Sequence, residues 1–221
     1  MNFKFIISFL LIPIIPALQV YSKPTDAAWT NWALNQTCNP KEIVKPKSDK
    51  ELINFIKKAN KENSKVRVVA SGHSWTDIVC SEYLVDMQNF NKVLNIDQEN
   101  KTVKVQAGMK TCDLNKELAK ENLALPNQSA IDIQTIAGAV ATATHGTGHT
   151  GTLSSFIKDI ELVSSDGKLH KLSDNKNPDY LAAARVAIGS LGVITALTLQ
   201  CEPLFELKTK RSIMNLKSII K

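Results

Sequence analysis

The sequence predicts an α+β fold. Helical patterns alternate irregularly with short strand-like runs and hairpins, so no regular βαβ repeat emerges. A hydrophobic fraction of 43% with 22% charged residues is typical of a globular protein rather than a disordered one. The 221 residues suffice for one large domain or two small ones, and no internal repeat or low-complexity segment divides them.

The first helix and strand of this pattern lie between residues 48 and 70. Ser48 can cap a helix, with Glu51 three residues on, and the apolar residues that follow recur at helical spacing. The pattern predicts a helix from about residue 49 to residue 61. The β-branched run KVRVVA follows as a short strand and leads directly into the sequence SGHSW.

Three further strand-like runs precede a second helix. The runs occupy residues 83–87, 92–97 and 102–108, and the sequence ENK supplies a turn between the last two. The sequence TCDLNKELAKENLAL then predicts a helix over residues 111–121, since its leucines recur at helical spacing.

The remaining elements are a small-residue segment, a hairpin, a helix and a strand. The segment from Gln134 to Gly148 holds no carboxylate or amine and is rich in Ala, Gly and Thr, which let a backbone approach another group closely. The sequence FIKDIELVSSDGKLHKLS predicts a hairpin that turns at its Asp-Gly pair. A third helix begins at the Asn-Pro pair of NPDYLAAARVAI, and GVITALTLQCEPLF is typical of a buried strand.

Residues 1–22 are typical of a secretory signal peptide. A lysine precedes an apolar run from Phe5 to Val20, and small residues stand before the sequence KPTD. The run is shorter than the roughly 20 residues that a membrane-spanning helix needs, and two prolines interrupt it. We expect cleavage near Ser22 and a protein of the secretory pathway or the extracellular space. The alternative is a membrane anchor formed by an uncleaved leader.

Four cysteines follow this leader: Cys38, Cys80, Cys112 and Cys201. They allow three pairings if all four are oxidised, and one disulfide and buried free thiols remain equally open. The absence of a Cys-x-x-Cys spacing disfavours a zinc ribbon. Three Asn-x-Ser/Thr sequences would be glycan sites in a secreted chain if they lay on surface loops: Asn35, Asn100 and Asn127.

The charge pattern disfavours a nucleic-acid partner. The formal net charge is +6, but the lysines are scattered along the chain instead of forming a basic block with interleaved aromatic residues. No helix-turn-helix, zinc or RNA-recognition signature accompanies the charge. We expect most of these lysines on a solvated surface.

The sequence THGTGHTG contains the spacing G-x-G-x-x-G at Gly146, Gly148 and Gly151. A nicotinamide-dinucleotide loop needs a strand before the first glycine and a helix after the last. Here a short helix or tight coil is expected before the glycines and a strand after them. Because both flanks are inverted, the match is interpreted as accidental.

A second glycine site lies in ASGHSW, residues 70–75, at the end of a strand. Gly72 permits close approach, Ser71 and Ser74 offer hydroxyls, and free backbone amides can cradle a pyrophosphate. The segment from Thr135 to Gly148 adds threonine hydroxyls and no acid that would repel a phosphate. Two such strips suit an extended dinucleotide better than a single phosphate.

From about Trp32 to Phe205 the chain closely resembles the FAD-binding domain of the aldonolactone oxidases, the group of L-gulonolactone oxidase and D-arabinono-lactone oxidase. This group belongs to the vanillyl-alcohol-oxidase type of flavoproteins. The matching motifs are VRVVASGHSWTDI, QTIAGAVATATHGTG and ARVAIGSLGVITALTLQC. The resemblance implies an FAD-binding domain over residues 32–205, with two packed α+β lobes at about 32–97 and 98–205 and the flavin between them.

The resemblance also implies roles for single residues. His73 is the candidate for a covalent bond to the flavin 8α-methyl group, and Ile194 is expected at the adenine end. The pyrophosphate would be held by Ala70, Ser71, Gly72, His73, Ser74 and Trp75. The other side of the FAD would be lined by Ala130, Thr135, Gly138, Thr142, Ala143, Thr144, His145 and Gly146. His145 is as readily explained by structural hydrogen bonding, and His149 and His170 are expected on the surface.

In this family a substrate-covering domain follows the flavin domain, and residues 206–221 are expected to be only its start. The resemblance implies an oxidoreductase that oxidises a sugar 1,4-lactone with FAD, passes the electrons to oxygen or to another electron acceptor, and gives an ascorbate-like product. Two alternatives stay open. One is a secreted flavin-binding module without turnover, and the other is a related flavin oxidase of another alcohol.

Overall fold

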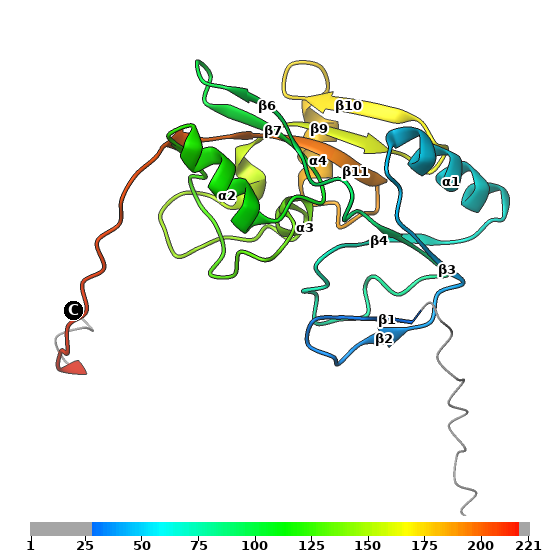
Figure 1. The fold of residues 1–221 in the computed structure, drawn as a ribbon, viewed down its shortest axis with the longest axis horizontal. Coiled ribbons are helices and arrows are strands. Elements are labelled where there is room, and N and C mark those ends of the chain that lie inside the picture. The colour runs from blue at the N-terminus through cyan, green and yellow to red at the C-terminus, as the bar shows by residue number, and fades with distance from the viewer. Residues whose placement is uncertain (1–27, 217–221) are drawn as a thin grey trace, which may run out of the picture.

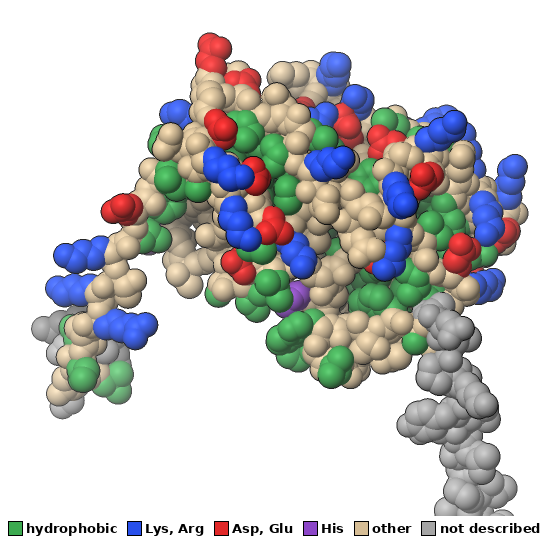
Figure 2. Space-filling view, in the orientation of Figure 1, with side chains coloured by type: hydrophobic (Ala, Val, Ile, Leu, Met, Phe, Trp, Pro, Cys, Tyr) green, Lys and Arg blue, Asp and Glu red, His purple; other side chains and the backbone are tan. Residues whose placement is uncertain are grey.

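A computed structural model describes residues 28–216 (Figure 1). The predicted signal peptide, residues 1–22, and the last residues of the predicted substrate-domain segment lie outside the described residues. Within the described range, no helix is long and apolar enough to cross a bilayer. On the face shown in Figure 2, lysine and arginine side chains are spread among acidic ones instead of gathering in one patch.

The larger sheet has five strands in the order β10-β9-β11-β7-β6, and all of its neighbouring strands are antiparallel. The last long strand of the chain, β11, lies at its centre. The strands are β6 (Val93–Asp97), β7 (Thr102–Gln106), β9 (Ile157–Val163), β10 (Leu169–Ser173) and β11 (Val193–Gln200). The predicted hairpin is confirmed, since β9 pairs with β10 across a turn in which Gly167 has φ +75°.

The smaller sheet has three parallel strands in the order β3-β5-β4. These are β3 (Glu42–Val44), β4 (Val66–Val69) and β5 (Tyr83–Asp86). Helix α1 (Asp49–Lys61) connects β3 to β4. The helix and the strand after it were predicted, and the Ser48 side chain accepts a hydrogen bond from the Glu51 amide. The parallel pairing was not predicted, because the three residues of β3 are too few to show a period.

The chain passes from the smaller to the larger sheet between β5 and β6. The sequence placed the boundary between the two lobes near residue 97, but β6 already pairs with β7 in the larger sheet. The change of sheet therefore falls between Asp86 and Val93. Both sheets still share one hydrophobic core, in which Leu52 and Phe55 of α1, Val85 of β5 and Leu197 of β11 are buried.

Three further helices bury side chains in this core. They are α2 (Thr111–Lys120), α3 (Ile136–Ala141) and α4 (Pro178–Arg185), and a short 3-10 helix, η1 (Leu153–Phe156), precedes β9. The predicted second and third helices are thereby confirmed. Helix α3 before the glycines and strand β9 after them also confirm that THGTGHTG is no nicotinamide-dinucleotide loop.

Two short strand pairs complete the fold. Strand β8 (Leu123–Ala124) pairs with β12 (Glu202–Pro203), and β1 (Trp29–Thr30) pairs with β2 (Thr37–Cys38). In Figure 1 the β1–β2 hairpin lies below the smaller sheet, on the side away from the larger one.

The cysteines divide into one disulfide and two free thiols. Cys38 and Cys80 are bonded, whereas Cys112 and Cys201 are free. Burial raises the pKa of the Cys201 thiol to about 11. A thiol with this pKa stays protonated and packs as a small apolar side chain.

The three predicted glycan sequences differ in exposure. Asn35 and Asn100 are exposed, but Asn127 is only 8% exposed. The Asn127 amide group donates to the carbonyls of Thr150 and Gly151, and its oxygen accepts from the Gly146 amide. Asn127 is therefore a structural residue of this loop and not a surface glycan site.

Candidate cofactor-binding site

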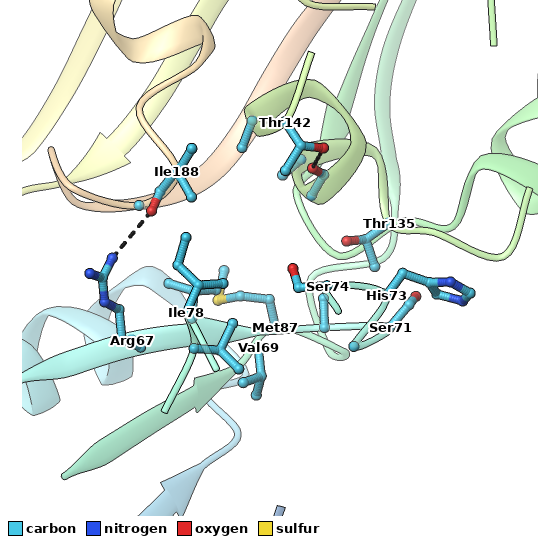
Figure 3. Close-up of a pocket in the computed structure, with 18 of the residues that line it drawn as sticks. Arg67, Val69, Ser71, His73, Ser74, Ile78, Met87, Thr135, Thr142 and Ile188 are labelled. Carbon is cyan, nitrogen blue, oxygen red and sulfur yellow. Dashed lines mark hydrogen bonds between the residues drawn. The ribbon is translucent and has the colours of Figure 1, made fainter. Parts of the chain in front are cut away.

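A cavity of about 330 Å³ lies between the two sheets. Its walls come from strand β4 and the loop after it, from helix α3 and from the loop that leads into β11 (Figure 3). This volume is in the range of ligand-binding pockets, and a site between lobes is a common place for one. The cavity therefore is the candidate functional site.

The loop of residues 70–75 forms one wall directly after β4. Gly72 has φ +66°, a backbone conformation that residues with a Cβ rarely adopt. A Cβ at this position would also lie 3.1 Å from the Trp29 indole. The Ser71 hydroxyl donates to the Ile133 carbonyl at 2.6 Å, which ties the loop to the segment before α3. The sequence thus folds here into a fixed, tight turn.

His73 projects from this loop at one end of the cavity. Its ring stacks on Trp32 with a centroid distance of 5.0 Å and an interplanar angle of 19°. The Nε2 atom of His73 is buried and has no hydrogen-bond partner among the described residues. The Oε1 atom of Gln134, another lining residue, is buried and unpaired in the same way. Buried polar atoms of this kind are rare in folded proteins and point to a missing bonding partner such as a ligand.

Helix α3 supplies the opposite wall with small side chains. Thr135 precedes the helix and is buried, while Gly138 is exposed toward the cavity. The Thr142 hydroxyl donates to the Gly138 carbonyl at 3.1 Å. The helix is held in place because the amides of Ile136 and Ala137 donate to carbonyls of the segment after β7. A backbone lined with Gly, Ala and Thr allows a ligand to approach closely.

The other end of the cavity lies at Arg67 and Ile188. Arg67 donates from Nη1 to the Ile188 carbonyl at 3.3 Å. Figure 3 shows these two residues on one side of the labelled set and His73 on the other. The site is therefore elongated, as an extended ligand requires.

The charge of the lining suits an anionic ligand. No Asp or Glu is among the described residues that line the cavity, and Arg67 is the one Arg or Lys among them. With no carboxylate to repel a phosphate, the hydroxyls of Ser74 and Thr135 are available near the walls. The tight turn, the small-residue wall, the elongated shape and the unpaired Nε2 of His73 all fit a bound dinucleotide.

The structure brings ten of the predicted site residues together in the cavity lining: Ala70, Ser71, Gly72, His73, Ser74, Trp75, Thr135, Gly138, Thr142 and Ile194. Five others are not among the lining residues: Ala130, Ala143, Thr144, His145 and Gly146. His145 bonds through Nδ1 with the Gly146 carbonyl, and Gly146 is held by Asn127, so this run contributes hydrogen bonds to the loop that follows α3. His149 and His170 are exposed, as expected.

Sequence reasoning missed part of the lining: Arg67, Met87, Ile188, Gly189 and Gly192. A signal for the last two was present in the sequence IGSLG. Gly189 and Gly192 both have positive φ values, +74° and +144°, and a Cβ on Gly192 would collide with the Val163 carbonyl. Two glycines at this spacing before a strand therefore mark a backbone that folds tightly at the cavity.

Comparisons with known proteins agree with a dinucleotide-binding function. Residues 40–173 match the family described as FAD binding domain. The chain is 46% identical over 181 residues to L-gulono-1,4-lactone dehydrogenase of Mycobacterium tuberculosis, covering 81% of this chain and 42% of that protein. It is 38% identical over 192 residues to L-gulonolactone oxidase of Mus musculus, covering 86% and 44%.

The fold is shared with a solved flavoenzyme. The structure of cholesterol oxidase from B. sterolicum superposes with a TM-score of 0.72 at 21% sequence identity, covering 80% of this chain and 37% of that one. This likeness shows the fold alone, which is the FAD-binding fold of the vanillyl-alcohol-oxidase type. The chain spans less than half the length of the curated relatives named above. With the family match over residues 40–173, the chain belongs to the FAD binding domain family, so its cofactor is FAD.

Proposed function

We propose that this chain forms the flavin-binding part of an oxidoreductase that oxidises a sugar 1,4-lactone of the L-gulono- or D-arabinono-lactone type, with oxygen as electron acceptor and an ascorbate-like product. One observation carries the proposal: an elongated cavity without carboxylates has the unpaired Nε2 of His73 at one end. The names of the relatives, which contain L-gulono-1,4-lactone and L-gulonolactone, support the substrate class.

The residues of the cavity would divide the work of holding FAD. The loop of residues 70–75 and the small-residue wall of α3 would hold the pyrophosphate by hydroxyls and backbone amides. The end at Arg67 and Ile188 would take the adenine part, to which the family resemblance assigns Ile194, and the end at His73 would take the flavin ring. When bound, FAD supplies a hydride acceptor, and the protein contributes binding, orientation and exclusion of water.

His73 is proposed to bond covalently to the flavin 8α-methyl group. A neutral imidazole nitrogen without a hydrogen-bond partner can act as a nucleophile. Overall, one methyl C–H and one imidazole N–H are replaced by a C–N bond. The two hydrogens leave with two electrons and reduce one oxygen molecule to hydrogen peroxide.

Acid precipitation tests this bond. Flavin should stay with the precipitated native protein, and a tryptic peptide that contains His73 should carry the flavin mass. His73→Ala should lose all acid-stable flavin while still binding FAD reversibly. His149→Ala is the matched control, because His149 is an exposed histidine outside the cavity lining, and this variant should retain acid-stable flavin. Complete release of flavin from the native protein would refute the covalent bond.

Peroxide release separates the proposed oxidase from its alternatives. L-Gulono-1,4-lactone and D-arabinono-1,4-lactone should each be compared with free alditols on the flavin-loaded protein. Peroxide with a lactone alone supports the proposed function, and peroxide with the alditols alone supports an oxidase of another alcohol. Bound flavin without any peroxide supports a flavin-binding module.

Secretion is proposed from the leader at residues 1–22, with membrane anchoring by an uncleaved leader as the alternative. The Cys38–Cys80 disulfide supports an oxidising compartment, because disulfides persist there and are rare in the cytosol. N-terminal sequencing of the protein released by the producing cells should begin near Lys23. A membrane-bound protein that keeps Met1 would support the anchor instead.

A further inference from the structure

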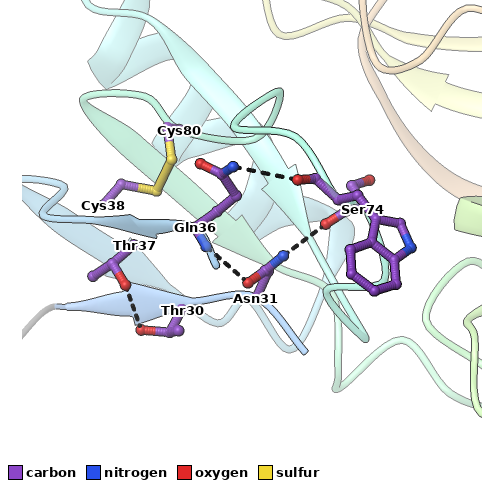
Figure 4. The surroundings of a disulfide bond; sticks show 8 residues. Thr30, Asn31, Gln36, Thr37, Cys38, Ser74 and Cys80 are labelled. Carbon is purple, nitrogen blue, oxygen red and sulfur yellow. Dashed lines mark hydrogen bonds between the residues drawn. A yellow bond between two sulfur atoms is a disulfide. The ribbon is translucent and has the colours of Figure 1, made fainter. Parts of the chain in front are cut away.

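The β1–β2 hairpin, residues 29–38, packs against the cofactor loop although it precedes the residues matched by the family model, 40–173. Figure 4 shows the hairpin beside the loop that carries Ser74, with the Cys38–Cys80 disulfide at its far end. We refer to residues 29–38 as the clamp hairpin. The clamp hairpin contacts His73 and also the residues before and after it.

Asn31 links the clamp hairpin to the cofactor loop. It is 2% exposed, so its amide side chain needs partners for all its polar atoms. Its Nδ2 donates to the Asn35 Oδ1 at 2.6 Å and to the Ser74 carbonyl at 2.9 Å, and its Oδ1 accepts from the Gln36 amide at 3.1 Å. One buried side chain thus closes the turn of the hairpin and fixes the loop.

Other donors of the hairpin reach two more carbonyls of the same loop. The Trp32 amide donates to the Gly72 carbonyl at 2.9 Å. The Trp75 carbonyl accepts from the side chains of Asn35 at 3.0 Å and Gln36 at 3.3 Å. The backbone is therefore held just before His73 and at the two residues after it.

The side chain of Trp32 holds the imidazole itself. The indole stacks on the His73 ring at 5.0 Å and meets the Trp75 ring edge-on at 5.7 Å. Stacking fixes the plane of the imidazole and leaves its edge atoms free. One of those, Nε2, is the buried atom without a partner at the cavity.

We propose that the clamp hairpin is a positioning device for His73, in which Trp32 holds the plane of the imidazole and Asn31 anchors the loop. The clamp hairpin thereby increases the fraction of molecules in which the His73 ring is aligned with the flavin. This inference rests on the proposed function, in which the flavin ring lies at the His73 end of the cavity.

Trp32→Ala tests the proposal with little risk to the fold, because Trp32 is 52% exposed. An aromatic pair contributes about 0.5–1.5 kcal/mol, so the aligned fraction should fall about two- to twelvefold. The FAD-free full chain is mixed with saturating FAD, and acid-stable flavin is measured over time. Trp32→Ala should slow its accumulation by that factor, with the affinity for FAD reduced much less. Trp32→Phe should restore most of the rate.

Leu34→Ala is the matched control, because Leu34 lies in the same turn, is 79% exposed and lines no part of the cavity. Leu34→Ala should accumulate acid-stable flavin at the same rate as the native chain. Asn31→Asp is a second test, since a carboxylate cannot donate to the Ser74 carbonyl, and it should slow the rate without changing the stacking partner. Thermal melting of each FAD-free variant separates slower attachment from loss of the fold.

The ring protons of His73 give a readout that needs no flavin. The indole of Trp32 shifts the NMR resonances of a stacked imidazole, so Trp32→Ala should move them and Leu34→Ala should not. Unchanged rates and unchanged ring resonances in Trp32→Ala would overturn the proposal. A native chain that binds no FAD would refute the proposed function instead, and the ring resonances would still decide whether the hairpin holds His73.

Discussion

Gly72 shapes the cofactor loop because its backbone lies in the left-handed region, with φ +66°. A side chain there faces two costs, the backbone conformation itself and the Trp29 indole at 3.1 Å. Gly189 has a similar φ of +74°, but a Cβ there would meet no atom within 4 Å. Substituting each of the two glycines therefore distinguishes the cost of the backbone conformation from the cost of the steric contact.

Gly72→Ala should destabilise the FAD-free protein by about 2 kcal/mol or more, and Gly189→Ala by about 1 kcal/mol. The difference should reflect the displacement of Trp29, and with it of the hairpin, by the new methyl group. Urea unfolding of both variants measures the two values. Equal destabilisation would mean that the Trp29 contact relaxes at no cost.

The sequence could predict some site residues and not others for physical reasons. The residues of ASGHSW form a continuous loop at the end of a strand, so a prediction for one applied to its neighbours, and all six line the cavity. The run from Ala143 to Gly146 was expected from the family resemblance, and it lies outside the cavity lining because the chain turns after α3, where Ala143 has φ +53°. Arg67 and Ile188 meet across 121 residues, and no local pattern reveals such a contact.

At the scale of the elements, Glu161 of β9 is a carboxylate within the larger sheet. Its side chain is 15% exposed and bonds with Lys104 at 2.7 Å and Lys171 at 3.0 Å. Burial would raise the pKa of Glu161, but the two lysines outweigh this effect and lower it. The neighbouring Asp49 at the start of α1 has its pKa raised, first by burial and then by repulsion from Glu161.

Glu161→Gln should lower the free energy of unfolding by about 1 kcal/mol at pH 7, and by progressively less below about pH 4.5. A carboxyl group whose pKa is lowered by folding stabilises the protein above its unfolded pKa, and this contribution is lost as the pH falls through its folded pKa. Asp49 acts in the opposite direction, since its raised pKa favours the protonated form in the fold. Urea unfolding at a series of pH values measures the difference, and a cost that stays constant with pH would contradict the assignment.

Helices were predictable from the sequence and the parallel sheet was not. Helix α1 buries Leu52, Phe55, Ile56 and Ala59 at helical spacing, so its period is visible in one stretch of sequence. Strand β3 has only three residues, and its partner β5 follows about 40 residues later. A period of two cannot be recognised in three residues, so this pairing depended on tertiary contacts.

For the molecule as a whole, the Cys38–Cys80 disulfide joins the hairpin to the segment after the cofactor loop. The two cysteines are 42 residues apart in sequence. Closing a loop of this length should stabilise the fold by about 4 kcal/mol, chiefly by restricting the unfolded chain. The sequence left the pairing open, because only the fold determines which cysteines meet.

The double variant Cys38→Ser/Cys80→Ser should therefore lose about 2–4 kcal/mol of unfolding free energy. Cys112→Ser is the control, because Cys112 is a free and partly exposed thiol, and its stability should stay close to that of the native chain. Urea unfolding without reductant measures both. A double variant as stable as the native chain would show that the hairpin is held by its hydrogen bonds alone.

The position of β11 at the centre of the larger sheet determines when the sheet can form during protein synthesis. Strands β9 and β7 both pair with β11, which is made after either of them, so the sheet cannot close until the ribosome has passed Gln200. Ile194 and the two glycines before it also belong to the cavity wall. The cofactor loop of residues 70–75 is therefore complete long before FAD can be captured, because the cavity wall also needs residues that are made only when the ribosome reaches β11.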